Sequence, residues 1–227
     1  MAVNDLFSFD LVDGLASSEC PLCYAIDSEV RRWLDSFWRE GRQSHDARRR
    51  FFTGGGFCRR HAWILCELLS QYSGAAIADL YGRLAEHDLS RLAQVISQRR
   101  QGAKASRHLQ RRAICSACEE EGEVLERKAA FLAELLSDAT GRARYECSYG
   151  VCYPHLLALI AATDGDESLT RYVLNDWSRR LSGLRRRLAE YDRTRDYRYA
   201  SERSRVDERS WEEVVQQYVG APPRAPT

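Results

Sequence analysis

Residues 51–61 read FFTGGGFCRRH, and residues 145–155 read YECSYGVCYPH. Each stretch opens on an aromatic residue, places a glycine two positions before a cysteine, and ends on a histidine three positions after that cysteine. A Cys-x-x-Cys pair precedes each stretch, and the gap from Cys23 to Cys58 is 35 positions while the gap from Cys118 to Cys152 is 34. The chain therefore carries one pattern twice, which indicates a duplicated unit.

Each copy of the pattern contains three cysteines and one histidine, which is a complete tetrahedral shell for a zinc ion. Soft thiolates with an imidazole favour zinc or iron–sulfur chemistry over magnesium or calcium. We expect two zinc ions per chain, with an iron–sulfur cluster as the alternative cofactor. The expected ligands are Cys20, Cys23, Cys58 and His61 for the first ion and Cys115, Cys118, Cys152 and His155 for the second. Spacing does not exclude the exchanged arrangement, in which the Cys-x-x-Cys of one unit meets the Cys-x-x-His of the other.

Apolar residues recur at three- and four-residue steps through most of the chain, whereas alternating runs of β-branched residues are missing. This periodicity predicts an all-α protein. Pro21 suits the first position of a helix with Cys20 as its N-cap. A helix start at each motif brings a cysteine and the ligand three positions later to the same side of the first turn. We therefore expect two pseudo-repeated helical units, each with a Cys-x-x-Cys and a Cys-x-x-His at helix starts.

The expected division has four parts: a first helical unit over 15–100, a basic linker over 101–112, a second helical unit over 113–196, and a polar tail over 197–227. In the first unit, Gly74 suits the end of the helix that follows His61. A longer helix follows, with apolar positions at Ile77, Leu80, Tyr81, Leu84, Leu92, Val95 and Ile96. In the tail we expect a short helix over 211–219, capped by Ser210 and stopped by Gly220, that docks on its own domain.

Composition limits the class of protein. The chain has 227 residues, and its 34 Lys and Arg nearly balance 33 Asp and Glu, so net charge gives no strong case for nucleic acid. The N-terminus has no basic segment before an apolar core, and no stretch approaches the ~18 apolar residues of a membrane span. We expect a cytoplasmic protein with no membrane partner, in which cysteines serve as ligands rather than disulfides.

Several other residues of reactive types have ordinary explanations. Cys66 is expected to be a small buried hydrophobic residue, and Cys147 a bystander in the loop that leads to the second histidine motif. Three further histidines lack partners at ligand spacing and are expected at the surface; they are His45, His87 and His108. The arginine groups are expected on solvated helix faces, unless they join the basic linker in tracking phosphates. These groups are Arg48 to Arg50, Arg59 and Arg60, Arg179 and Arg180, and Arg185 to Arg187.

The strings CPLC at 20–23 and GFCRRH at 56–61, with their second copies, resemble an uncharacterised bacterial family of cysteine-rich proteins with paired CxxC and GFCxxH motifs. That family is catalogued only as a domain of unknown function. The resemblance spans most of the chain and supports the ligand assignment. It implies no catalytic activity and no catalytic residues.

Two closed metal shells without a recognisable catalytic constellation suggest a non-enzymatic module that binds a protein partner or nucleic acid. The alternative is a redox or electron-transfer protein with iron–sulfur clusters or reactive dithiols. A third hypothesis is catalytic zinc, with His61 or His155 displaced by water. The sequence leaves the oligomeric state open.

Overall fold

The computed structural model describes residues 9–40, 44–70, 74–110, 114–202, 204 and 208–222. These residues form helices joined by short connections, and no strand occurs among them. The prediction of an all-α fold is therefore confirmed.

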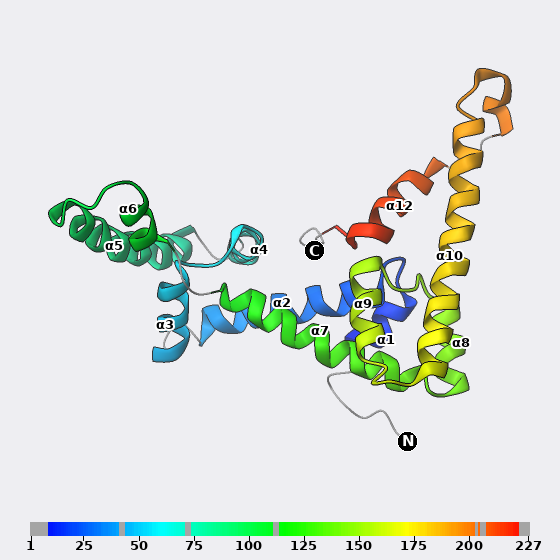
Figure 1. Ribbon diagram of the computed structural model, residues 1–227, viewed down its shortest axis with the longest axis horizontal. Helices are drawn as coiled ribbons and strands as arrows, with labels where there is room; N and C mark the ends of the chain where they lie inside the picture. Colours follow the sequence, from blue (N-terminus) through cyan, green and yellow to red (C-terminus); the bar gives the residue numbers. More distant parts are fainter. Residues whose placement is uncertain are drawn as a thin grey trace. The chain divides into compact units, whose positions relative to one another are not determined.

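In the described part of the chain the helices follow one another with short connections (Figure 1). In order they are α1 (Phe9–Ala16), α2 (Pro21–Arg39), α3 (His45–Gly54), α4 (Arg59–Ser70), α5 (Gly74–Ser97), α6 (Gly102–Leu109), α7 (Ser116–Leu135), α8 (Ala139–Cys147), α9 (Tyr153–Ala161), α10 (Glu167–Arg193), the 3₁₀ helix η2 (Tyr197–Glu202) and α12 (Ser210–Val219). Within the described residues, none of these helices is both long enough and apolar enough to cross a membrane.

The chain divides into two compact units, and each unit draws on both halves of the sequence. Unit 1 combines the residues up to Ser28 with those from Val124 to Arg224, and unit 2 contains Glu29–Glu123. Helices α2 and α7 each begin in one unit and end in the other. These compact units differ from the sequence units 15–100 and 113–196, whose common origin by duplication stays a prediction.

Unit 1 is built around the amphipathic helix α10, which begins at Glu167 and is capped by the side chain of Asp166. Its buried face includes Leu169, Val173 and Leu184, and α9 and α12 pack against it. Apolar residues of the other helices complete this core; among those fully shielded from solvent are Leu11, Leu22, Leu132, Leu136, Tyr145 and Leu159. This burial supplies the main stabilisation of the unit.

Arg180 of α10 fixes the loop that leads to Cys152. Its guanidinium donates to the carbonyl oxygens of Ser148 at 2.6 Å and Tyr145 at 3.0 Å, and it pairs with Asp176 at 2.6 Å. Gly150 has a φ of 81°, and a Cβ there would lie 2.7 Å from the Arg180 Nε. Arg180 was expected on a solvated face, and this expectation is wrong because the side chain is needed to satisfy loop carbonyls inside the unit.

In unit 2, aromatic rings occupy the equivalent place before Cys58. Phe57 lies edge-on to Phe37 at 5.0 Å and to Phe51 at 5.1 Å between ring centroids. Trp33 and Tyr81 extend this cluster from α2 and α5. Edge-to-face packing of buried rings is favourable beyond the area that it removes from water. The cluster therefore holds the start of α4, with its cysteine and histidine, against α2, α3 and α5.

Two local predictions need correction. Gly74 begins α5 rather than ending the preceding helix. The tail helix forms and packs on α9 and α10 as predicted, but its N-cap is Arg209 and Ser210 is buried in the first turn. Of the apolar positions expected on α5, Leu92 and Ile96 are exposed. The segment expected as a linker contains the helix α6, while Arg111 and Arg112 lie outside the described residues.

Candidate metal centres

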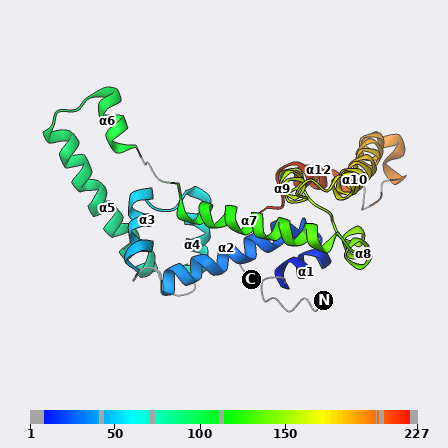
Figure 2. The same ribbon diagram turned by 60° about the horizontal axis from the view of Figure 1, so that its bottom comes forward.

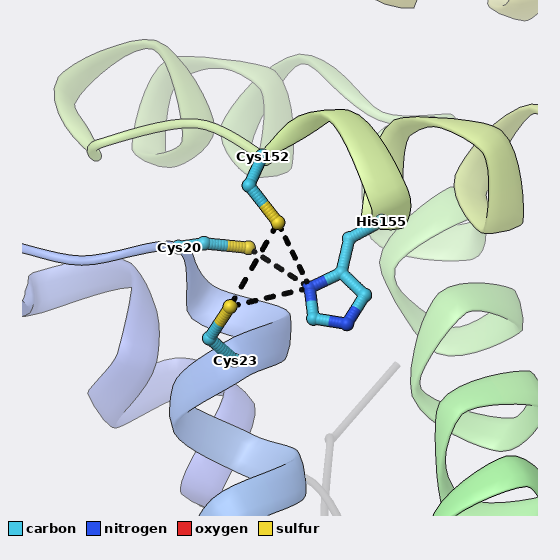
Figure 3. A group of neighbouring side chains, drawn as sticks. All are labelled: Cys20, Cys23, Cys152 and His155. Atoms are coloured by element: carbon cyan, nitrogen blue, oxygen red, sulfur yellow. Dashed lines mark hydrogen bonds between the residues drawn. The ribbon is translucent and has the colours of Figure 1, made fainter. Parts of the chain in front are cut away.

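In unit 1, four donor atoms from the starts of α2 and α9 meet at one point, which we call site 1. Cys20 precedes α2, Cys23 lies in its first turn, Cys152 is the N-cap of α9 and His155 lies in the first turn of that helix. Figure 3 shows the three sulfur atoms arranged around the Nδ1 of His155, at 3.3 Å for Cys20, 3.4 Å for Cys23 and 3.3 Å for Cys152. The Sγ atoms of Cys23 and Cys152 are 3.8 Å apart.

In unit 2, the starts of α4 and α7 form an equivalent group, site 2. Cys58 directly precedes α4 and His61 lies in its first turn, while Cys115 directly precedes α7 and Cys118 lies in its first turn. The Nδ1 of His61 lies 3.3 Å from the Cys58 sulfur, 3.4 Å from Cys118 and 3.7 Å from Cys115. The sulfur atoms of Cys118 and Cys58 are 3.7 Å apart. In each site all four donor atoms lie within 4.8 Å of one another.

The structure corrects the way in which the ligand pairs combine. We expected Cys20 and Cys23 to share an ion with Cys58 and His61, but they meet Cys152 and His155 instead. The Cys-x-x-His of the first half correspondingly meets the Cys-x-x-Cys of the second half. This is the exchanged arrangement that spacing left open. All eight expected ligand residues belong to one of the two groups, and each group of four lies within one compact unit.

The prediction that every motif sits at a helix start is confirmed. Each of the four pairs has its first cysteine immediately before a helix and its second ligand in the first turn. The carbonyl oxygen of that first cysteine accepts the first helical hydrogen bond, as in the bond from the Leu156 N–H to Cys152 at 2.8 Å. A helix N-terminus stabilises a thiolate through its free N–H groups and its dipole. Two helix starts therefore point their positive ends at each group of sulfurs.

The spacing of the donor atoms fits a single ion. A neutral imidazole Nδ1 carries at most one proton, so it cannot satisfy three sulfurs that all approach to 3.3–3.4 Å in site 1. For a tetrahedral zinc ion with ordinary bond lengths, the ligand-to-ligand distances are about 3.8 Å between two sulfurs and about 3.6 Å between sulfur and nitrogen. The observed separations of 3.7–3.8 Å and 3.3–3.7 Å agree with those edges. The four residues of each site therefore fit around one metal ion.

The pKa shifts in site 1 reflect the close approach of its three sulfurs. Hydrogen bonds from Cys20 and Cys23 lower the pKa of Cys152 to about 4, so this sulfur is a thiolate at neutral pH. Burial, followed by the hydrogen bonds and charges of Cys152 and Cys23, raises the pKa of Cys20 well above its ordinary value. Three sulfurs this close cannot all ionise, because each thiolate opposes the next. A metal cation would remove that opposition and deprotonate the remaining thiols.

In site 2 the charge is shared between a thiolate and the imidazole. Burial would raise the pKa of Cys115, but the hydrogen bond with His61 and the backbone hydrogen bonds of Cys58, Cys118 and Ala117 together lower it to about 6. Burial and the charge of Cys115 raise the pKa of Cys118 to about 12. Burial would lower the pKa of His61, yet hydrogen bonds with Cys115 and Glu121 raise it to about 9. The opposite shifts of Cys115 and His61 mean that a negative sulfur and a positive imidazole stabilise each other here.

Site 2 has a carboxylate behind its histidine. The Nε2 of His61, which is fully buried, lies 3.3 Å from a carboxylate oxygen of Glu121, and Arg60 pairs with the other oxygen. The hydrogen bond from His61, together with the Arg60 charge, holds the pKa of Glu121 below its usual range. Such a carboxylate fixes the tautomer and orientation of a metal-binding histidine and raises its basicity. Sequence reasoning missed Glu121, although its place one turn after Cys118 in α7 was a usable signal.

Site 1 is instead covered by the end of the C-terminal helix. The backbone N–H of Ala221 donates to the Cys23 sulfur at 3.4 Å, and a Cβ on Gly220 would lie 3.2 Å from that sulfur. Gln217 of α12 donates to the carbonyl oxygen of Val151 at 2.9 Å, next to Cys152. The glycine that stops α12 therefore also allows the chain to pass close to the sulfurs. The sequence signalled the helix end but not its contact with the site.

The other cysteines and histidines take no part in either group. Cys66 is half-buried on α4 rather than fully buried, and Cys147 is exposed at the last position of α8 rather than in a loop. His45 and His87 are exposed, as predicted. His108 is half-buried against α5, where its ring contacts Arg100 and its carbonyl oxygen accepts from Arg91 at 2.7 Å.

Comparison with protein-family models matches residues 3–220 to a family described as "Family of unknown function (DUF6062)". This match confirms the resemblance that the cysteine and histidine motifs suggested. Comparisons with curated proteins and with solved structures gave no match. The donor geometry of the two sites is therefore the basis for a functional argument.

The ligand pairing makes a direct prediction for double substitutions. Cys23→Ser with Cys152→Ser removes two ligands from site 1, so the variant should keep one metal ion per chain after dialysis against a chelator. Cys23→Ser with Cys58→Ser removes one ligand from each site and should keep none. Metal analysis of the purified variants measures the difference, and Cys147→Ser is the control that should keep both ions. If Cys23→Ser/Cys152→Ser keeps no ion and Cys23→Ser/Cys58→Ser keeps one, the ligand pairs combine within each half of the sequence instead.

The carboxylate behind His61 makes a second prediction. Glu121→Gln should weaken metal binding at site 2 by about 10–100-fold, because His61 loses the acceptor that orients it. Competition with a chromophoric chelator should show one weakened ion and one unchanged ion. Glu119→Gln, which removes an exposed carboxylate from the same helix turn, is the matched control. Equal affinities for the two glutamine variants would show that Glu121 has no role at the site.

Proposed function

The chain belongs to this family of unknown function, and from the two closed Cys₃His groups we propose that it is a non-enzymatic binding module held together by two structural zinc ions. The observation that carries the proposal is the convergence of three sulfurs on one histidine Nδ1 in each site. Four protein ligands complete a tetrahedral shell, which is typical of structural rather than catalytic zinc.

Zinc is the metal that this geometry supports best. Three thiolates and an imidazole suit zinc by softness, and zinc accepts tetrahedral sites without an electronic preference. In an iron–sulfur cluster the protein ligands are divided between at least two iron atoms, so the donor atoms on different irons lie farther apart than the edges of one tetrahedron. Four donor atoms that all lie within 4.8 Å of one another therefore favour a single metal ion over a cluster. The same shells argue against catalytic zinc, because His61 and His155 each complete a site with protein ligands.

The proposed role of each ion is to join two helix starts within one compact unit. Site 1 would join α2 to α9, and site 2 would join α4 to α7. The ligands come from segments separated by 129 positions in site 1, counted from Cys23 to Cys152, and by 57 in site 2, counted from His61 to Cys118. Because the unfolded chain holds no such preformed site, much of the metal-binding free energy stabilises the fold.

A protein partner is favoured over nucleic acid for this module. Several arginines that were expected to face solvent form ion pairs within their own unit, which lowers the net positive charge available to phosphates. They are Arg49 with Asp46, Arg60 with Glu121, Arg179 and Arg180 with Asp176, and Arg187 with Glu213. We further propose a reducing, cytoplasmic location, since all eight cysteines are free and the six ligand thiols must stay reduced to bind metal.

The zinc proposal predicts a colourless protein with about two zinc ions per chain. Removing the ions with a strong chelator should lower the thermal unfolding midpoint sharply, and restoring zinc should recover it. Elemental analysis and circular dichroism measure these effects. A brown anaerobic preparation with absorbance near ~400 nm would instead support iron–sulfur clusters. A metal-free protein with unchanged stability and a readily cycled disulfide would favour the redox alternative.

The partner proposal predicts no measurable binding to DNA or RNA, even at low salt. Fluorescence anisotropy with mixed-sequence oligonucleotides tests this across a salt series, because phosphate contacts weaken steeply as salt rises. The variant Arg99→Ala/Arg100→Ala/Arg111→Ala/Arg112→Ala is the comparison. Salt-dependent binding by the wild type that this variant loses would replace the protein partner with nucleic acid.

A further inference from the structure

Helix α5 carries an apolar stripe that nothing in its own unit covers. The stripe consists of Ala78, Gly82, Ala85, Leu89, Leu92 and Ile96, spaced alternately by four and three residues. All six are exposed, including Leu89 at 64% and Ile96 at 74%. Residues spaced in this way occupy the a and d positions of a coiled coil, which contact a second helix along a narrow line. We call these six residues the seam.

This seam is separate from the face with which α5 joins unit 2. Leu80, Leu84 and Val95 are buried, and Arg91 on the same side donates to His108 of the α6 region. On a helical wheel these positions centre about 120° away from the seam. Figure 2 shows α6 folded back beside the far part of α5, and the exposed fractions show that it does not cover the seam. Polar residues such as Arg83, Ser90 and Gln94 occupy the remaining side of the helix.

The sizes of the seam residues change along the helix. The N-terminal half presents Ala78, Gly82 and Ala85, whereas the C-terminal half presents Leu89, Leu92 and Ile96. If a second α5 runs antiparallel in one register, Ala78 faces Ile96, Gly82 faces Leu92 and Ala85 faces Leu89. Every small residue then faces a large one, and each a position faces a d position. A parallel pair would place small against small and large against large, which leaves voids in one half and crowding in the other.

We propose that α5 is a self-association surface, at which two copies of this chain pair through antiparallel α5 helices. Antiparallel helices bring opposite ends of their dipoles together, which favours this direction. Near the two-fold axis, by contrast, the two Glu86 carboxylates lie close enough to repel.

The size of the seam sets the strength of the pairing. Six seam residues from each copy, over about 27 Å of helix, bury on the order of 1,000 Å² in total, which is near the lower limit for a specific interface. The pair should therefore be a reversible dimer that dissociates on dilution, with a Kd in the micromolar range. Gly82 leaves open space, with no heavy atom within 4 Å of an added Cβ, where the Leu92 side chain of the second copy fits.

Sedimentation velocity of the full zinc-loaded chain over a concentration series tests the proposal. The wild type should move from monomer to dimer as concentration rises, and Leu89→Glu should stay monomeric throughout. Gln94→Glu adds the same charge on the polar side of α5 and should behave as the wild type. A wild type that stays monomeric at all concentrations overturns the proposal. The unfolding temperatures of the Leu89→Glu and Gln94→Glu monomers are also compared. A lower value for Leu89→Glu overturns the proposal, because it would show that the seam is covered by other residues of the same chain.

A size exchange tests the register and direction. Ala85→Leu and Leu89→Ala should each weaken the dimer about tenfold or more, since one crowds the central layers and the other empties them. The double variant Ala85→Leu/Leu89→Ala should restore affinity to within a few-fold of wild type, because each leucine again faces an alanine. Glu86→Gln should tighten the dimer by removing the repulsion across the axis. A double variant weaker than both single variants would overturn the antiparallel register.

Discussion

Three sulfur atoms and one imidazole nitrogen crowd together in each unit, and the negative charge of the ionised sulfurs needs a cation among them. The proposed metal ions would meet this requirement, and each would join two helix starts. In site 1 the pKa of Cys152 is lowered while that of Cys20 is raised, and in site 2 the pKa of Cys115 is lowered while that of His61 is raised. A metal ion bound by all four donors satisfies every member of each group together. The starts of four helices, α2, α4, α7 and α9, are placed so that this can happen.

The two sites share a donor set but differ in what lies behind it. Site 2 supports its histidine with a carboxylate that is held in turn by Arg60. Site 1 receives a backbone N–H from Ala221, at the end of a helix distant in sequence from all four ligands. The loops before the two Cys-x-x-His motifs also use different chemistry, since Phe57 belongs to an aromatic cluster whereas Arg180 binds the carbonyl oxygens before Cys152. The supporting contacts thus differ while the ligand geometry is the same.

The fold class, the eight ligands and their positions at helix starts were all predictable, because each depends on residues within a few positions of one another. Pro21 and the three-residue ligand spacing suffice for that. The combination of pairs was not predictable, since it depends on how segments more than fifty positions apart come together. Arg180 was misjudged for the same reason: its acceptors, Ser148 and Tyr145, are 32 and 35 positions away. On α5, the periodicity identifies Leu92 and Ile96 as apolar positions but not their exposure, because it shows that an apolar face exists and not which partner covers it.

The exchange of ligand pairs between halves also sets an order in time. During synthesis the chain completes the ligands of site 2 when Cys118 has emerged, 57 positions after His61. Cys20 and Cys23 must wait for Cys152, 129 positions after Cys23, and then for His155. At ordinary translation rates this wait lasts from several seconds to about half a minute. During this wait the first Cys-x-x-Cys is an exposed dithiol whose partner residues have not yet been made. At this stage of synthesis, oxidation of the two cysteines or binding of a metal ion by this pair alone competes with correct assembly.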